Sequence, residues 1–311
     1  MKAWMRNLKV TLTSRKLKKQ IVFGGNEDGP NLNIDVRGHK YMSTLKDECT
    51  IRISNLTYSE IVRIIDGQFY DVTVEAGYRS SGSNVFFDGG VIYISNSLDD
   101  ERTNTVVILC GSKLVAKYGQ ARINLTLNSG INMYSAIKYI CKVNGISTAN
   151  ISQQLKKSFL NEPSTVSNSA SSWINSFCQE NSEYIVNSDS STGSTLSIFD
   201  CTKSNARVID LTNSLSNLVG GYPQLTNDGL SFSIMPTFNF MCGDVVKMDN
   251  SIISLPTNSR KEVEQNYGYF LDKDGLYMIY EMDYSFQNRG ADFSINILAK
   301  KRSLISDYVG R

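Results

Sequence analysis

The segment Asn7-Leu8-Lys9-Val10-Thr11-Leu12-Thr13 alternates apolar and polar side chains one residue at a time. Successive side chains of a β-strand point to opposite faces, so this period of two predicts a strand with one buried face. The apolar character continues to Phe23. The run Gly24-Gly25-Asn26-Glu27-Asp28-Gly29-Pro30 then predicts a turn-rich loop. The chain therefore begins as a β protein.

Short strands continue beyond this loop with brief connections between them. One short helix is expected at Thr57–Asp66, where Ile61, Val62, Ile64 and Ile65 supply the apolar residues. Strands that recur with short loops and a single helix predict a barrel or a sandwich. We assign residues 1–118 to this first β domain. Its further strands are expected at Asn33–Gly38, Glu48–Ser54, Tyr70–Tyr78, Val85–Ser95 and Thr103–Cys110.

Residues 119–225 have a different pattern, which predicts a small α/β insert. Asn132 can cap a helix whose apolar residues fall at helical spacing, with Gly145 just past its end. Ile151, Leu155 and Phe159 repeat that spacing before Pro163. The remaining expected elements are a third helix with Trp173, Ile174, Phe177 and Cys178 on one face, and a hairpin of Tyr184–Val186 with Thr195–Phe199.

Residues 226–311 return to strands and end in an expected tail of about a dozen residues. Strands are expected at Leu230–Ile234, after the turn Cys242-Gly243-Asp244, and at Tyr267–Phe270, Leu276–Phe286 and Ala291–Ala299. The last two are joined across Gln287–Gly290, as in a hairpin. The predicted fold class is mainly β (α+β): two β domains with an α/β insert between them.

Composition excludes several classes of protein. The formal net charge of +2 over 311 residues is far from the basic balance of a dedicated nucleic-acid-binding domain. Met1–Arg6 lacks the apolar run of a signal peptide, and no stretch approaches the roughly 18 apolar residues of a membrane span. We expect a chain that is made in a cytoplasm, stays soluble until assembly and does not insert stably into a membrane.

The cysteines indicate the same compartment. Six occur, none spaced as C-x-x-C, and most lie in apolar segments; they are residues 49, 110, 141, 178, 201 and 242. This pattern predicts buried free thiols, with a disulfide framework as the alternative.

The sequence predicts no catalytic, cofactor or metal residues. His39 is the single histidine, so zinc sites that need two or three imidazoles cannot be built within one chain. We interpret His39 as a partly exposed loop histidine at the end of a strand. No H-E-x-x-H, G-x-S-x-G or G-x-x-x-x-G-K-[ST] motif occurs. Glycoside hydrolysis needs two carboxylates positioned as acid and base. With 30 acidic residues some pair will always lie close in space, so such a pair does not indicate a hydrolase.

Two further charged features have a structural interpretation. Asn26–Gly29 and Asp272–Gly275 lack the ligand spacing of a calcium loop, so turn chemistry explains both. Met1–Gln20 holds seven basic residues and no acidic one. We favour a solvated strand edge protected by lysines, with a surface for a partner or for DNA as the alternative. An N-terminal strand that does not close its own sheet is suited to pairing with a neighbouring copy in a ring.

Several segments together resemble the baseplate hub proteins of phage tails. They are Ile51–Tyr58, Val72–Tyr78 and Val85–Ile92, which match a strand with an I-x-N-L turn, an A-G-Y strand end and an F-x-G-x-I strand. The helix at Tyr134–Val143, Gly229-Leu230 with Pro236 and Gly243–Val246, and the closing hairpin at Gly275–Ala299 also fit. The resemblance spans nearly the whole chain, and it is carried by the order of short motifs.

This resemblance implies a structural virion protein and no enzyme. Hubs of this family are trimers in which each subunit contributes two tail-tube-like β-barrel domains, so that the ring imitates sixfold symmetry. The implied partners are a tail tube protein above, a separate spike protein below, other baseplate proteins, and DNA passing through the lumen. The implied location is the tail baseplate of a virion, on a tail that the resemblance favours as contractile. No cofactor is implied. The alternatives are a hexameric tube or distal-tail subunit, a tail-tip cell-wall hydrolase, and a carbohydrate-binding receptor module.

Overall fold

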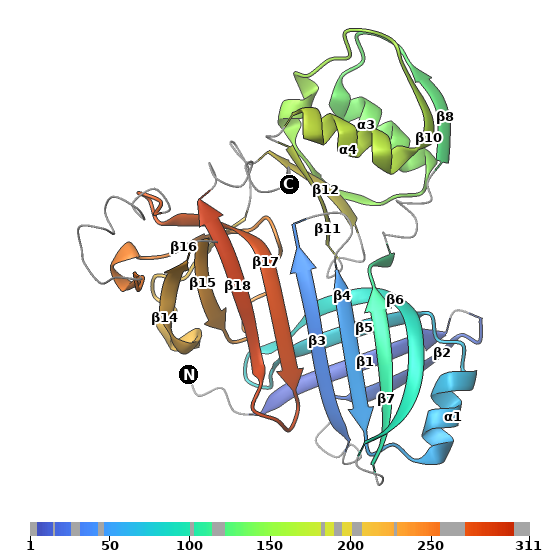
Figure 1. Cartoon of the computed structure of the whole chain (residues 1–311), viewed down its shortest axis with the longest axis vertical. Coiled ribbons are helices and arrows are strands. Elements are labelled where there is room, and N and C mark those ends of the chain that lie inside the picture. The colour runs from blue at the N-terminus through green and yellow to red at the C-terminus, as the bar shows by residue number, and fades with distance from the viewer. Residues whose placement is uncertain are drawn as a thin grey trace.

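The computed structural model of the chain is built mainly from antiparallel strands, with a small helical lobe beside one large sheet (Figure 1). It describes residues 5–14, 16–25, 32–42, 47–99, 103–113, 122–181, 184–189, 195–200, 207–226, 229–255 and 271–301. The predicted turn at Asn26–Gly29, Cys201, the strand at Tyr267–Phe270 and the C-terminal tail lie outside these residues. Among the helices described, none has both the length and the apolar character to cross a membrane.

The N-terminal third forms the strands that the sequence predicts there, and the strand Lys19–Gly24 in addition. They are β1 (Arg6–Ser14), β2 (Lys19–Gly24), β3 (Asn33–Tyr41), β4 (Glu48–Ser54), β5 (Asp71–Tyr78), β6 (Gly82–Asp99) and β7 (Thr103–Gly111). In β1 the side chains of Leu8, Val10 and Leu12 are buried, while the residues between them are half-buried. β2 turns back antiparallel onto β1. The first apolar stretch is therefore a hairpin.

The predicted helix near Thr57 is confirmed as α1 (Tyr58–Asp66). It begins with a capping box, because Thr57 Oγ1 accepts a hydrogen bond from the Glu60 amide while the Glu60 carboxylate accepts one from the Thr57 amide at 2.8 Å. Only Ile61 and Ile64 of its apolar residues are buried. Val62 and Ile65 are exposed, so the helix covers the core with one narrow face.

The C-terminal third supplies the strands β13 (Val208–Asp210), β14 (Leu218–Thr226), β15 (Gly229–Ile234), β16 (Val245–Lys247), β17 (Leu276–Gln287) and β18 (Phe293–Lys301). The predicted closing hairpin is confirmed, because β17 and β18 pair antiparallel with Phe286 opposite Phe293. The sequence did not predict β14, in which Gly220 and Gly221 adopt positive φ inside a bulged ladder.

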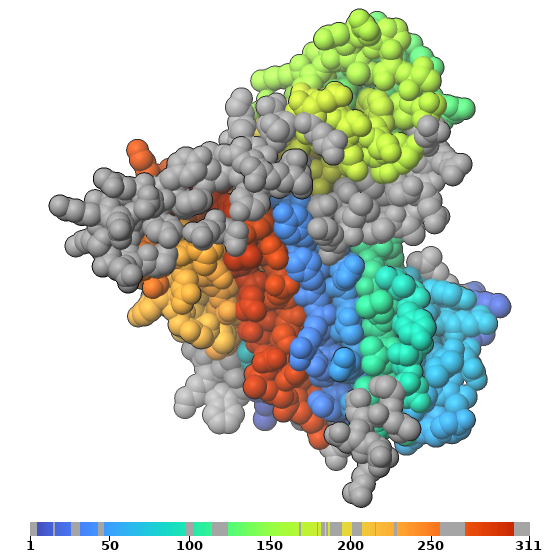
Figure 2. Space-filling view, in the orientation of Figure 1, coloured from blue at the N-terminus to red at the C-terminus, as the bar shows by residue number. Residues whose placement is uncertain are grey.

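Both ends of the chain belong to a single sheet. Its main path runs β14-β15-β18-β17-β3-β4-β7-β6-β5-β1-β2, with β16 and β13 attached to β17. One hydrophobic core extends beneath it from Leu8 to Ala299. Figure 2 shows the C-terminal strands lying directly beside the blue N-terminal strands on this face. The mainly β fold is thus confirmed, while the division at residues 118 and 225 into two barrels stays a prediction.

The middle of the chain forms a lobe with a separate core. Its elements are β8 (Arg122–Leu127), α3 (Met133–Val143), β9 (Thr148–Ile151), β10 (Ser164–Ser169), α4 (Ala170–Glu180), β11 (Tyr184–Asp189) and β12 (Thr195–Asp200). Asn132 caps α3 as predicted, and its side chain accepts a hydrogen bond from the Ser135 amide at 2.8 Å. Ser169 caps α4 in the same way. The apolar faces of both helices, together with β11 and β12, enclose this second core.

The helix predicted through Ile151, Leu155 and Phe159 is wrong. Ile151 ends the strand β9, which pairs with β12, and Leu155 lies in a short 3₁₀ turn, Gln153–Lys156. Phe159 forms an isolated bridge with Asn132. Burial explains why this segment is not one helix. Ile151 and Leu155 are buried but belong to different elements, whereas Phe159 is exposed. Apolar residues four apart are compatible with both arrangements.

Candidate functional site

The candidate functional site is the seam where β17 pairs with β3. Residues Glu281–Gln287 lie antiparallel to residues Tyr41–Asp35, so the last long hairpin of the chain extends the sheet of the first strands. His39 and Asp283, which face each other across this seam, are 244 residues apart in the chain. The seam therefore decides how the two halves of the sheet are placed relative to each other.

The turn between β17 and β18 is hydrogen-bonded to the N-terminal strands. The Asn288 side-chain oxygen accepts a hydrogen bond from the Ile34 amide at 2.8 Å, and its nitrogen donates to the Leu32 carbonyl at 3.0 Å. Arg6 donates to the carbonyl oxygens of Gln287 and Ala291, each at 3.0 Å. The amino-acid sequence alone does not single out these residues. Asn is common in turns and Arg is common at charged strand edges, so neither residue type indicates a long-range contact.

At one position of the seam, β3 and β17 pack so closely that only a glycine fits. Gly38 is opposite Tyr284, and the Tyr284 ring occupies the space that a side chain at position 38 would fill. A Cβ built on Gly38 would be 1.9 Å from Tyr284 Cζ. Tyr284 is buried, and burial raises the pKa of its hydroxyl well above the ordinary range. The seam is thus packed by an aromatic ring over a glycine.

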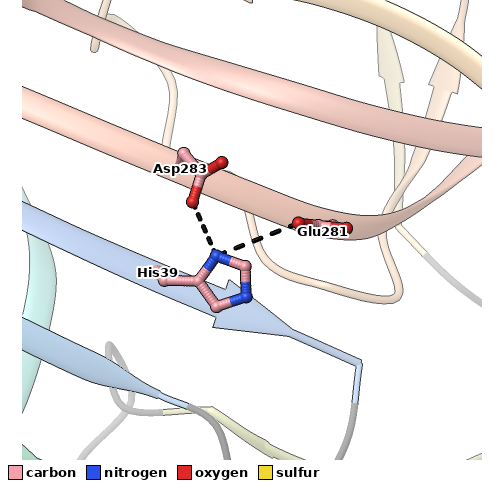
Figure 3. Close-up of side chains that lie close together, drawn as sticks. All are labelled: His39, Glu281 and Asp283. Atoms are coloured by element: carbon pink, nitrogen blue, oxygen red, sulfur yellow. Dashed lines mark hydrogen bonds and ion pairs between the residues drawn. The ribbon is translucent and has the colours of Figure 1, made fainter.

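The exposed face of the seam carries a polar row. Asn296, Asp283, His39 and Glu48 are successive cross-strand neighbours on β18, β17, β3 and β4. Figure 3 shows His39 facing Asp283 and Glu281. Its Nδ1 atom lies 2.6 Å from Asp283 Oδ1 and 3.9 Å from Glu281 Oε1. The interpretation of His39 as a loop residue is wrong, since β3 continues to Tyr41. Its partial exposure, 38% of the side chain, is confirmed.

An open hollow of about 440 Å³ lies over this row. Its lining combines basic, acidic and amide side chains from four strands and the β17–β18 turn, including Arg37, His39, Glu48, Asp283, Asp292 and Asn296. The ligand atoms of His39, Glu281 and Asp283 all lie within 4.8 Å of one another. No metal-binding residues were predicted from the sequence, because these three residues are dispersed along the chain.

Two strand edges bear exposed apolar side chains. β6 pairs with β5 through Gly90, and beyond that point only β7 pairs with it among the described residues. Ile92 and Tyr93 are exposed there, at 66% and 62%. At the other end of the sheet, β14 exposes Val219 and Tyr222, and its outer side is hydrogen-bonded to Ser254 at Pro223 and Leu225. Before Pro223 the described residues place no strand on that side. Open edges of this kind are suited to pairing with another chain.

The basic N-terminal segment is in part internally paired. Lys9 Nζ lies 2.8 Å from the Glu75 carboxylate on β5, and Arg6 lies 5.1 Å from the Phe293 ring centroid. Lys16, Lys18 and Lys19 are exposed at the β1–β2 turn. β1 pairs with β2 on one side and with β5 on the other, so it is not an edge strand, and the prediction of an N-terminal strand open to a neighbouring copy is wrong. The exposed lysines lie beside β2, which is the outer strand of this part of the sheet.

The remaining candidates from the sequence have structural roles. Asp272 Oδ1 accepts hydrogen bonds from the amides of Asp274 and Leu276, so turn chemistry explains Asp272–Gly275 as predicted. The five cysteines that the structure describes are buried thiols, as expected: Cys49, Cys110, Cys141, Cys178 and Cys242.

Comparison with known proteins was informative at the level of structure alone. No protein-family model and no curated protein matches the sequence. Among solved structures, the chain is similar to the 43 kDa tail protein of prophage MuSo2 from Shewanella oneidensis. The TM-score is 0.59 at 9% identity, over 97% of this chain and 98% of that one.

Two further structures point in the same direction. A tail protein from Neisseria meningitidis MC58 aligns with a TM-score of 0.55 at 8% identity, over 97% of this chain and 98% of that one. A type VI secretion component of E. coli, itself described as similar to the T4 bacteriophage tail proteins gp27 and gp5, aligns with a TM-score of 0.51. That alignment has 9% identity and covers 88% of this chain and 75% of the other. The resemblance seen in the sequence is thus confirmed for the fold: this chain has the fold of phage tail proteins.

Proposed function

We propose that the chain is a structural subunit of a phage-type baseplate hub, a trimeric ring between a hexameric tail tube and a trimeric spike. The observation that carries this proposal is the seam, through which two β regions of one polypeptide form a continuous antiparallel sheet. The fold supports a structural role in place of catalysis, since the solved structures that it resembles are tail proteins and a secretion-system component.

The strand order supports ring closure by copies of the same chain. From β14 to β6 the path β14-β15-β18-β17-β3-β4-β7-β6 holds eight strands, and every neighbouring pair is antiparallel. With an even number of strands, β14 and β6 run in opposite directions. Placing the β14 edge of one copy beside the β6 edge of the next would therefore continue the antiparallel pattern without a break.

Such a contact is head-to-tail, and head-to-tail contacts close into rings when the rotation permits. Three copies would have three β3–β17 seams within chains and three β6–β14 joints between chains. If the two kinds of joint are alike, the ring has near-sixfold symmetry, which suits it to a hexameric tube above and a trimeric spike below. The polar face that holds Arg37, His39 and Glu48 would then face the lumen through which DNA passes. We place this ring in the virion baseplate, next to other baseplate proteins, after assembly in the host cytoplasm.

The test is the mass and symmetry of the purified assembly. Light scattering should give about 104 kDa, three times the chain mass of 34.7 kDa, and particle images should have a threefold axis. Replacing the exposed edge residue Tyr93 with Lys should shift the mass to that of a monomer, because an unpaired charge would enter the strand joint. Tyr139→Lys is the matched control: Tyr139 is 50% exposed on α3 of the helical lobe, outside β6 and β14, and this variant should stay trimeric.

Three results would contradict the proposal. A mass of about 208 kDa, six times 34.7 kDa, would assign the chain to a hexameric tube or distal ring. A trimer that Tyr93→Lys leaves intact would place the interface elsewhere. Clearing of peptidoglycan by the purified protein, lost on replacing one Asp or Glu, would show the cell-wall hydrolase that the acidic residues leave as an alternative.

A further inference from the structure

The only histidine of the chain faces two carboxylates that belong to a different strand. Asp283 is its direct neighbour across the β3–β17 ladder, and Glu281 is two residues away on the same face. Both carboxylates approach one atom of the imidazole, Nδ1, as Figure 3 shows. One nitrogen and two carboxylate oxygens therefore converge on one point of the seam.

The spacing of these atoms is close to that of a metal site. Zinc–ligand distances of about 2.0–2.2 Å in a tetrahedral site place neighbouring ligand atoms roughly 3.3 Å apart. The separations from His39 Nδ1, 2.6 Å to Asp283 and 3.9 Å to Glu281, lie on either side of that value, and the two carboxylates approach each other within 4.8 Å. The side chains of His39 and Asp283 are 38% and 56% exposed, so both have room to adjust their torsion angles around an ion.

The hollow beside these residues and the chemistry of their side chains are also suited to a metal ion. The hollow of about 440 Å³ opens over His39 and Asp283, which gives an ion a path from solvent and room for a water ligand. Imidazole with carboxylates favours zinc and other divalent first-row transition metals, whereas calcium and magnesium prefer oxygen ligands throughout. An open fourth position is compatible with exchange of the ion.

We infer that His39, Glu281 and Asp283 bind a divalent transition metal ion, with Zn²⁺ as the representative, and that the ion cross-links the two halves of the sheet. The ligands come from β3 and β17, so they are together only when the seam is formed. A ligand that binds the folded chain and not the unfolded chain stabilises the folded state. The ion would thus hold the joint on which the relative placement of the two β regions depends.

The direct test uses the unaltered protein. Because His39 is the single histidine, its ring protons give one assignable set of NMR signals. Addition of Zn²⁺ to metal-free protein should shift or broaden this set and saturate at one equivalent per chain. Calorimetry should give the same stoichiometry, and the melting temperature should rise by a few degrees. Co²⁺ should give the visible absorption bands of a four- or five-coordinate site.

Matched variants separate this site from other acidic groups. His39→Gln and Asp283→Asn should each weaken Zn²⁺ binding at least tenfold and remove the thermal shift. Asp292→Asn removes a carboxylate that lines the same hollow outside the ligand set, so this variant should bind like the parent chain. Unchanged histidine signals at saturating Zn²⁺, or equal binding by all three variants, would overturn the inference. Assembly mass measured in EDTA is independent of this result, so the inference can fail while the proposed ring stands.

Discussion

At the scale of single residues, the seam depends on the absence of a side chain at position 38. The Tyr284 ring lies where the first carbon of any other side chain would be, and Tyr284 is itself buried. Neither strand can move away without loss of the ladder that joins β3 to β17. A glycine is therefore required here for close packing.

Gly38→Ala should destabilise the chain by about 1–3 kcal/mol, the range for an added methyl group that forces a shift in a packed core. The measurement is urea unfolding followed by circular dichroism. Gly90→Ala is the control, because a Cβ at Gly90 in β6 would have its nearest neighbour at 3.7 Å, an ordinary contact. Equal midpoints for the two variants would show that the packing over Gly38 is looser than described.

At the scale of elements, the β17–β18 turn does more than connect two strands. Asn288 exchanges hydrogen bonds with the backbone of Leu32 and Ile34, so the turn is bound to the start of β3. These hydrogen bonds hold the C-terminal hairpin against the N-terminal strands at the end of the seam next to the turn.

Asn288→Ala should lower the unfolding free energy by roughly 1–3 kcal/mol, because the Ile34 amide and the Leu32 carbonyl each lose a partner. Hydrogen exchange of the β3 amides should accelerate with it, if this turn holds the seam. Lys273→Ala changes an exposed side chain in the turn at the other end of β17 and should have little effect. Protection of β3 that is unaltered in the Asn288 variant would refute the role of the turn.

Some elements could be predicted from local sequence and others could not. Alternation located β1, and the apolar spacing behind Asn132 located α3 with its cap. β8 was missed although Ile123, Leu125 and Leu127 alternate with polar residues, the pattern that predicts a strand, whereas β10 was missed because Ser164–Ser169 is short and rich in polar residues. Such segments become strands by pairing with each other and by covering α3 and α4, and neither condition is visible locally.

At the scale of the whole molecule, the core holds thiols and phenols that resist ionisation. Burial raises the pKa of the Cys49, Cys141 and Cys178 thiols to about 12, from 9.0 in an unburied thiol. Burial raises the pKa of Tyr277 to about 12 as well. Each of these groups is neutral in the folded chain at pH values where it is charged in the unfolded chain.

The stability of the chain should therefore fall in alkaline solution. Between about pH 9 and pH 12 the unfolded chain binds fewer protons than the folded chain, so the unfolding free energy decreases as the pH rises. The contribution is fully present below pH 9. Urea midpoints at pH 7.5, 9.0 and 10.5 should decrease in that order. In Cys141→Ala the decrease between pH 7.5 and 10.5 should be smaller than in the parent chain. A midpoint that stays constant to pH 10.5 would contradict this account of the core.

The sequence by itself determined the local elements: strands where apolar and polar residues alternate, helices where caps precede apolar faces, and thiols that lie in apolar runs. These follow from interactions between residues close in the chain. Only the tertiary structure decided that β17 pairs with β3 and that His39 meets Glu281 and Asp283. Strand edges all offer the same amide and carbonyl groups, so local sequence does not specify the partner. The choice is made by the packing of a shared core, in which residues more than 200 positions apart contribute together.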